Sequence, residues 1–171
     1  MGAGTMYGDR CTVTHPTPGA GRYFAFPSRT ALERGQQAPR CSTELDGDAI
    51  RSNNDRNGLV TVNVNDRAVT AIRSPGETVD SATTVTPQIE VMNRGTVGDM
   101  TWARMYIGDF YEDSARVALH PGVTDTIVLS EWVASTVGQF EVRCTVWGRW
   151  EMVPENNVMT GTVRVLSSGI E

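Results

Sequence analysis

The chain has 171 residues, of which 39% are hydrophobic and 20% are charged, and its net charge is -5. This composition is typical of a globular protein rather than a disordered chain. The lack of a basic block argues against nucleic-acid binding, and the lack of an apolar run of about 18 residues excludes a transmembrane helix.

The first strand-like stretch, "RCSTELDGDAIRSNNDRNGLVTVNV" at Arg40–Val64, returns in similar form from Arg143 as "RCTVWGRWEMVPENNVMTGTVRVL". A shift of 103 places aligns the two copies. The alignment runs back without a gap to Pro18 and gives 12 identities over the 45 positions of Pro18–Val62. Chance would give about three at ordinary residue frequencies. We therefore predict a duplicated domain rather than two unrelated hairpins.

The duplication predicts an uneven division of the chain, because residues 65–103 have no upstream counterpart. We expect 1–64 to be the C-terminal half of a β-sandwich repeat, 65–167 to be a complete sandwich and 168–171 to be a tail. Half a sandwich exposes its inner face and two open edges, so residues 1–64 should need a partner or be poorly ordered. Phe24, Phe26 and Cys41 are expected on that uncovered face. The simplest explanation is a piece cut from a longer protein.

The complete copy shows short segments in which apolar and polar residues alternate, and no segment has a helical stripe. The expected strands are 68–72, 84–92, 100–107, 115–119, 125–129, 140–146 and 159–165. Pro87 indicates an edge or a bulge, because proline has no N–H to donate. Cys144 is expected to be buried between Val142 and Val146. The pattern predicts an all-β, antiparallel, immunoglobulin-like β-sandwich.

Four stretches carry a resemblance to a known family: "VTPQIEVMNRGT", "ALHPGVTDTIVL", "GQFEVRCTVWG" and "ENNVMTGTVRV". Their arrangement resembles the CARDB family, the cell-adhesion-related domain found in bacteria. The matching motif residues are Val91, Asn93 and Gly95, Leu119, Pro121 and Gly122, and Glu155, Asn156 and Asn157. The resemblance covers 66–166 in full and 18–64 in part, and it implies a fibronectin- or immunoglobulin-like sandwich. The stretch "GRWEMVPENN" lacks the aspartate-rich approach that is more usual in the family, which weakens any metal site implied by the resemblance.

A calcium site is one interpretation of the acidic loop in the first copy. Asp46, Asp48 and Asp55, with the nearby asparagines, could gather around Ca²⁺, which takes six to eight oxygen ligands. Their spacing is not that of an EF-hand loop, and the second copy retains fewer carboxylates. The pattern favours the alternative that the Asn-Asn pair of each copy fixes a turn. We therefore expect no metal and no cofactor.

Two tryptophans form a candidate ligand patch. Trp147 is expected on the polar face of its strand, and Trp150 follows in the next loop. Exposed aromatic side chains bind sugars or protein partners by stacking and burial. The alternative is that these rings pack against a neighbouring domain.

The cysteines and histidines carry no catalytic pattern. Cys41 and Cys144 occupy the same position in the two copies, and we expect them to be small buried hydrophobes rather than a disulfide. Cys11 has no evident mate. His15 and His120 each precede a proline, and no G-x-S-x-G or H-E-x-x-H motif is present.

The sequence therefore favours a non-catalytic extracellular β-sandwich repeat. Such a repeat acts as a spacer or as an adhesion and interaction module of a larger bacterial secreted or surface protein. A carbohydrate-binding accessory module is the alternative, and an enzyme is the least supported reading. The expected partners are other repeats of the same parent protein and a cell-surface protein or glycan. The expected location is extracellular or at the cell surface, although no signal peptide is visible.

Overall fold

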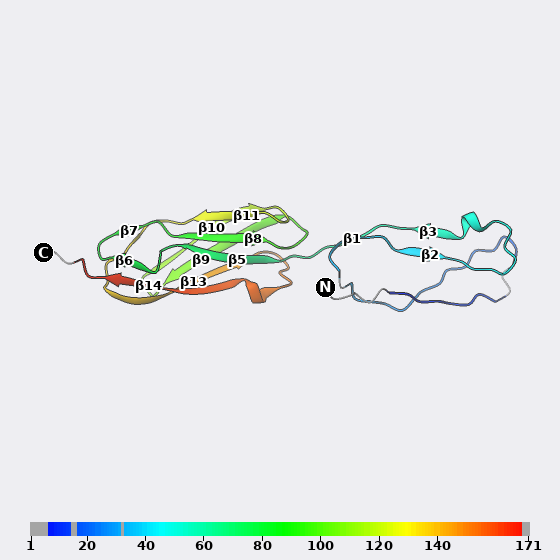
Figure 1. Cartoon of the computed structure of the whole chain (residues 1–171), viewed down its shortest axis with the longest axis horizontal. Coiled ribbons are helices and arrows are strands. Elements are labelled where there is room, and N and C mark those ends of the chain that lie inside the picture. The colour runs from blue at the N-terminus through cyan, green and yellow to red at the C-terminus, as the bar shows by residue number, and fades with distance from the viewer. Residues whose placement is uncertain (1–6, 15–16, 32, 169–171) are drawn as a thin grey trace. The chain divides into compact units, whose positions relative to one another are not determined.

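The computed structural model describes residues 7–14, 17–31 and 33–168. The chain divides into two units, Met1–Val62 (unit 1) and Asn63–Glu171 (unit 2). Their described residues form β-strands, turns and two single-turn 3-10 helices, so the expected all-β class is confirmed (Figure 1). In the described part of the chain, no helix is long and apolar enough to cross a membrane.

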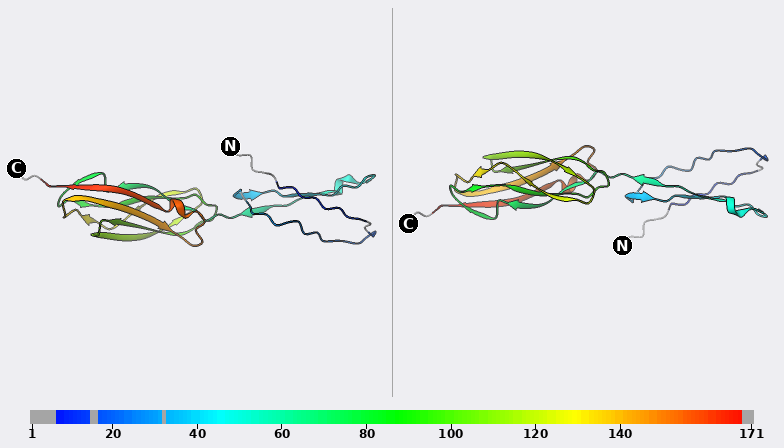
Figure 2. Two further views of the ribbon diagram at one scale, coloured as in Figure 1. Left: turned by 90° about the horizontal axis from the view of Figure 1, so that it is seen from below. Right: turned by 90° about the horizontal axis from the view of Figure 1, so that it is seen from above.

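Unit 2 is a sandwich of two larger sheets (Figure 2). One sheet has five strands in the order β10-β9-β13-β14-β6, the other has three in the order β11-β8-β5, and β12 pairs with β7. All pairs are antiparallel except β14 with β6. The strands are β5 (Arg67–Ser74), β6 (Thr78–Asp80), β7 (Thr84–Val85), β8 (Gln88–Asn93), β9 (Asp99–Ile107), β10 (Tyr111–Leu119), β11 (Thr124–Val128), β12 (Trp132–Val133), β13 (Gly138–Trp147) and β14 (Val158–Leu166).

The core of unit 2 lies between these two sheets. Alternation along the strands sends every second side chain inward. The inward residues include Ala103, Met105 and Ile107 of β9, Val142, Cys144 and Val146 of β13, and Ile89 and Val91 of β8, and each is at most 2% exposed. Full burial of one such aliphatic side chain contributes roughly 1.5–3 kcal/mol. Unit 2 therefore has a core of its own, and the expected burial of Cys144 is confirmed.

The segment 84–92, expected to be one strand, is two strands that belong to different sheets. β7 pairs with β12, whereas β8 pairs with β5 and β11. The chain changes sheet at Pro87, which has no N–H, and the Pro87 carbonyl accepts a hydrogen bond from the backbone N–H of Leu129 at 3.0 Å. The alternating pattern continued across this break, so the sequence did not reveal it.

The described residues of unit 1 form four short strands and one 3-10 turn, which are β1 (Gly35–Gln37), β2 (Arg40–Ser42), η1 (Arg51–Asn53), β3 (Asp55–Asn57) and β4 (Val60–Val62). β1 pairs with β4 and β2 with β3. The residues of these strands pair in the same register as those of β13 and β14, and each residue number is lower by 103. The matching pairs include Gly35–Val62 with Gly138–Val165, and Cys41–Arg56 with Cys144–Met159.

The loop inside this hairpin also repeats. η1 in unit 1 corresponds to η2 (Pro154–Asn156) in unit 2. The next residue, Asn54 or Asn157, donates its backbone N–H to the first carbonyl of the turn at 3.2 Å in both units. Each asparagine pair therefore marks the same turn.

A tyrosine contact extends the equivalence toward the N-terminus. The hydroxyl of Tyr7 donates to the carbonyl of Pro27 at 2.9 Å, and that of Tyr111 donates to the carbonyl of Ser130 at 2.7 Å. Pro27 and Ser130 differ by 103 positions, whereas the two tyrosines differ by 104. Unit 1 therefore has one more residue than unit 2 between the tyrosine and the following Pro-Gly turn. In sequence its described residues align with β10–β14 of unit 2, although 7–14 and 17–31 form no strand.

The two units differ sharply in burial, because no described residue of unit 1 is buried. Phe24 is 46% and Phe26 43% exposed, whereas their equivalents Ile127 and Leu129 are each 5% exposed. The expected exposure of this apolar face is confirmed. The expectation that Cys41 is a buried hydrophobe is wrong, since its thiol is exposed.

Candidate functional site

A row of one arginine and two tryptophans crosses the outer face of the five-stranded sheet. Strand register places Arg116 of β10 beside Trp102 of β9, and Trp102 beside Trp147 of β13. The neighbouring residues on these strands point into the core, so this row points outward. The two indole rings are parallel within 4°, with centroids 6.0 Å apart, and each tryptophan is 37% exposed. The two rings are therefore stacked on each other.

Two guanidinium groups lie against this surface. The Cζ atom of Arg116 is 5.2 Å from the ring centroid of Trp102, and that of Arg104 is 5.1 Å from the ring centroid of Trp147. Cation–π contacts of this kind contribute about 0.5–1 kcal/mol at exposed sites. Arg104 also donates from Nη1 to the Tyr106 hydroxyl at 2.9 Å, which raises the pKa of Arg104. These contacts fix the orientation of both indoles.

A hollow of about 490 Å³ lies beside the row. Its lining residues are Asp99, Met100, Trp102, Arg116, Trp147, Gly148 and Arg149. Small-molecule sites combine apolar or aromatic walls with a few polar groups that fix orientation, and they occupy about 300–1,000 Å³. The indoles supply aromatic surface, and the charged groups can hydrogen-bond to hydroxyls or carboxylates. The hollow therefore combines aromatic and charged side chains within the size range of small-molecule sites.

Trp150 lies apart from this row. It is 78% exposed, and the Cζ atom of Arg149 is 5.8 Å from its ring centroid. Its φ of 51° is in the left-handed region, which is unusual for a bulky residue, and the equivalent residue in unit 1 is Gly47 with φ 79°. The sequence grouped Trp150 with Trp147, whereas the ring stacked on Trp147 is that of Trp102. Only the pairing of β9 with β13 reveals this neighbour.

Two of the three calcium candidates of unit 1 are engaged by protein donors. The Oδ1 atom of Asp48 accepts the backbone N–H of Ile50 at 2.9 Å, which lowers the pKa of Asp48. The Oδ1 atom of Asp55 accepts from Nη2 of Arg40 at 2.8 Å, and Asp46 is exposed. Among the described residues, no group of three or more His, Cys, Asp or Glu is placed to hold a metal ion.

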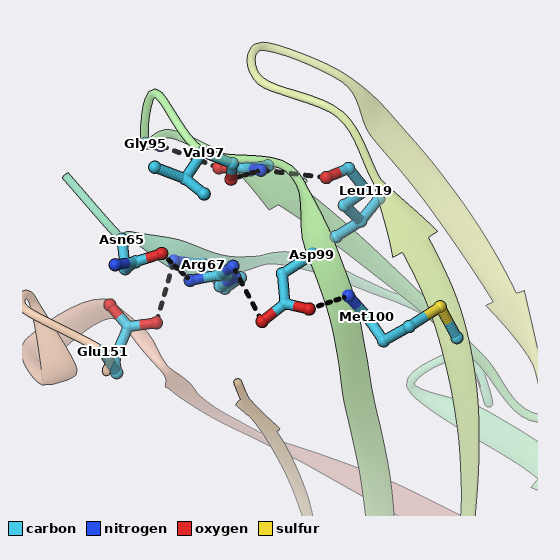
Figure 3. A network of polar contacts seen from close by, with 9 residues as sticks. Asn65, Arg67, Gly95, Val97, Asp99, Met100, Leu119 and Glu151 are labelled. Carbon is cyan, nitrogen blue, oxygen red and sulfur yellow. Dashed lines mark hydrogen bonds and ion pairs between the residues drawn. The ribbon is translucent and has the colours of Figure 1, made fainter. Parts of the chain in front are cut away.

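A buried arginine organises one end of unit 2 (Figure 3). Arg67 is 0% exposed, and its Nη1 donates to Oδ1 of Asn65 at 3.1 Å. Its Nη2 lies 3.8 Å from Oδ2 of Asp99, and its backbone N–H donates to Oε2 of Glu151 at 3.1 Å. Gly148 leaves room for the guanidinium, since a Cβ there would lie 3.1 Å from Nε. The positive charge among these oxygen atoms is thus the guanidinium of Arg67.

Asn93 joins two of the turn motifs. Its Nδ2 donates to the carbonyls of Val97 at 2.8 Å and Leu119 at 3.0 Å, and its Oδ1 accepts the N–H of Gly95 at 2.9 Å. Gly95 must be glycine, because a Cβ there would come within 2.3 Å of the Val64 carbonyl. Asn93 and Gly95 thus hold the loops around them in place.

The remaining reactive side chains are separate from the tryptophan row. Cys144 is buried, and burial raises its pKa to about 12, so its thiol is protonated at neutral pH. Cys11 and Cys41 are exposed, and all three cysteines are free thiols. His120 is exposed in a turn, and His15 lies outside the described residues.

No protein-family model and no curated protein matches the chain. Among solved structures, the chain is similar to the crystal structure of a CARDB domain from Pyrococcus furiosus in complex with di-metal ions. That match has 25% identity and a TM-score of 0.56, and it covers 64% of this chain and 100% of that chain. The solution NMR structure of the same domain has 25% identity and a TM-score of 0.54, covering 61% and 98%. The chain therefore resembles the CARDB family in three-dimensional structure as well as in its turn motifs.

Proposed function

We propose that the chain consists of two CARDB-like repeats, with unit 2 complete and unit 1 carrying the second half of a repeat. The observation that carries this proposal is the strand register. β1–β4 pair as β13 and β14 do, at the constant offset of 103 positions. The repeated turn and tyrosine contacts support the same equivalence.

The function that follows best is that of a non-catalytic spacer or adhesion module in a larger bacterial secreted or surface protein. The similarity of unit 2 to a CARDB domain supports it. The buried polar groups support it as well, because Arg67 and Asn93 are engaged in holding loops. The partners would be neighbouring repeats and a cell-surface protein or glycan.

Limited proteolysis of intact cells tests the proposed location. Cells of the source organism are treated with protease, and the chain is followed with an antibody against unit 2. We expect digestion without lysis, while a cytoplasmic marker survives. If the chain is digested only after lysis, the extracellular module is refuted.

A carbohydrate-binding module is the second candidate, and the hollow beside Trp102 and Trp147 favours it. A glycan array followed by calorimetry tests this candidate directly. Alanine at either tryptophan should remove binding, because both rings line the hollow and would be buried against the ligand. Trp150→Ala is the matched control and should bind as the wild type does. No array signal, or loss of binding only with Trp150→Ala, would contradict the assignment.

We also infer that unit 2 holds its loops without a metal ion, although the Pyrococcus furiosus CARDB domain is described with di-metal ions. The guanidinium of Arg67 places a positive charge among Asn65, Asp99 and Glu151. A divalent cation at the same place would be repelled by that charge.

A further inference from the structure

The hollow beside Trp102 and Trp147 presents the edge of the central indole ring rather than its faces. Arg116, on the β10 side of Trp102, places its guanidinium over that ring, and Trp147, on the β13 side, is stacked against it. Protein groups therefore occupy the faces of Trp102. Because the face of an aromatic ring is negative and its edge is positive, the part of Trp102 that is left to a ligand attracts negative charge.

Hydrogen-bond donors without protein acceptors gather at this hollow. Arg116 and Arg149 line it, both side chains are exposed, and neither forms a hydrogen bond or an ion pair with any described residue. The indole N–H groups of Trp102 and Trp147 likewise have no acceptor in the part of the chain that the structure describes. Guanidinium and indole N–H groups donate hydrogen bonds but cannot accept them. A matching ligand therefore supplies acceptors.

Asp99 is the one carboxylate among the lining residues, and the protein itself satisfies it (Figure 3). Its Oδ1 accepts the backbone N–H of Met100 at 2.7 Å, and its Oδ2 lies 3.8 Å from Nη2 of the buried Arg67. The charge of Asp99 is thus balanced by Arg67, whereas no carboxylate balances Arg116 and Arg149. The hollow is therefore positively charged in a chain whose net charge is -5.

We propose that the hollow binds an acidic saccharide, with Arg116 and Arg149 pairing with the carboxylates of uronate rings. The proposal rests on the carbohydrate-binding candidate above and names the ligand class of that site. A guanidinium presents parallel N–H donors that match the two oxygens of a carboxylate. The N–H groups of Trp102 and Trp147 are available to the ring oxygens and hydroxyls of the saccharide, which accept hydrogen bonds.

An acidic peptide fits this surface less well than an acidic saccharide. β9 pairs with both β10 and β13, so Trp102 lies on a strand with no free backbone edge to which a peptide could add. The amides of a peptide also bring N–H donors, whereas the only carboxylate of the hollow, that of Asp99, is already engaged. Hydroxyl groups accept as well as donate, so a saccharide leaves fewer polar groups without a partner.

Calorimetry of the whole chain with matched saccharides tests the proposal. The ligands are trimers of galacturonate, mannuronate and glucuronate, each compared with its carboxyl-reduced form, in which an alcohol replaces every carboxylate. At least one acidic trimer should bind about tenfold or more tightly than its reduced form, because hydrogen bonds to charged groups are the stronger ones. This preference should weaken between about 0.05 and about 0.5 M salt, since the arginines are exposed.

Single arginine variants locate the binding. Arg149→Gln and Arg116→Gln should each weaken binding of that trimer about tenfold. The ring beside Arg149 is that of Trp150, which does not line the hollow, so Arg149→Gln leaves the stacked rings in place. Arg164→Gln is the matched control, because Arg164 is an exposed arginine of β14 on the same sheet but outside the hollow. It should bind as the wild type does, and all three variants should unfold at the wild-type urea concentration.

The outcomes separate this proposal from those on which it rests. It is overturned if no acidic trimer binds, if the reduced trimers bind equally well, or if Arg164→Gln weakens binding as much as Arg149→Gln. Equal binding of a capped tri-glutamate peptide would also overturn it. If neutral saccharides bind without a preference for carboxylates, only the ligand class is wrong and the carbohydrate-binding candidate stands. Failure of that candidate appears as no signal from any glycan on the array.

Discussion

Substitution at the two equivalent cysteines separates the core of unit 2 from the open face of unit 1. Cys144 is 0% exposed between Val142 and Val146, whereas Cys41 is exposed. Cys144→Ala removes one buried sulfur and should lower the free energy of unfolding by about 1 kcal/mol. Cys144→Asp buries a carboxylate without a partner, at a cost of several kcal/mol. That cost is comparable to the whole stability of a domain, about 5–15 kcal/mol.

Urea unfolding followed by tryptophan fluorescence measures the effect on unit 2 alone, because all four tryptophans lie in that unit. Trp132 is 6% exposed in the core and should report its loss. Cys41→Asp is the matched control and should leave the transition within about 0.5 kcal/mol of the wild type. The reasoning is refuted if Cys144→Asp keeps a cooperative transition near the wild-type midpoint. It is also refuted if Cys41→Asp destabilises unit 2 as much.

Burial raises the pKa of Cys144 from 9.0 to about 12. The protonated thiol therefore makes its full contribution to the free energy of unfolding below pH 9, and this contribution is lost as the pH rises from about 9 to about 12. The urea midpoint of the wild type should therefore fall more over this range than that of Cys144→Ala; parallel curves would contradict this. Removal of Ca²⁺ by a chelator should not move the melting temperature, whereas a site occupied at 100 times its Kd would add about 2.7 kcal/mol, so a clear drop would reject our expectation. Glu151→Ala removes the acceptor of the Arg67 and Val153 N–H groups and should cost unit 2 about 1–3 kcal/mol, while Asp48→Ala, its equivalent in unit 1, should not shift the fluorescence transition. In sedimentation experiments the whole chain should associate more than a chain beginning at Asp66, because of its exposed apolar face; a monomeric and more stable whole chain would show that the half-repeat interpretation is wrong.

Much of the sandwich was predictable from alternation along single strands. β13 and β14 follow the expected faces, because each buries one side against a core and leaves the other in water. The sequence did not show β6, whose three residues pair with β14 in parallel and are too few to display a period. It also did not reveal the break at Pro87, since the pattern continues where the strand changes sheet.

The candidate site was predicted in part, because a site formed across strands depends on register. Trp147 was identified from its place on the polar face of a strand. Its partner Trp102 lies 45 positions away in the sequence, and only the pairing of β9 with β13 brings the two rings together. Arg67 was not singled out, because nothing in the local sequence indicates that a guanidinium will be fully buried.

The constant offset between the two units indicates where this protein tolerates changes in length. A single added residue within the β13–β14 hairpin would reverse the inward and outward faces of one strand, and no such change separates the two copies there. The one added residue of unit 1 lies before the turn that ends in Gly19. Gly19 has a φ of 78°, and its equivalent Gly122 has a φ of 75°. In unit 2 the same turn, at 120–122, is exposed. A change in length before this turn therefore leaves the following strands in register, whereas the turn itself is held to β8 by the N–H of Gly122, which donates to the Asn93 carbonyl at 2.9 Å.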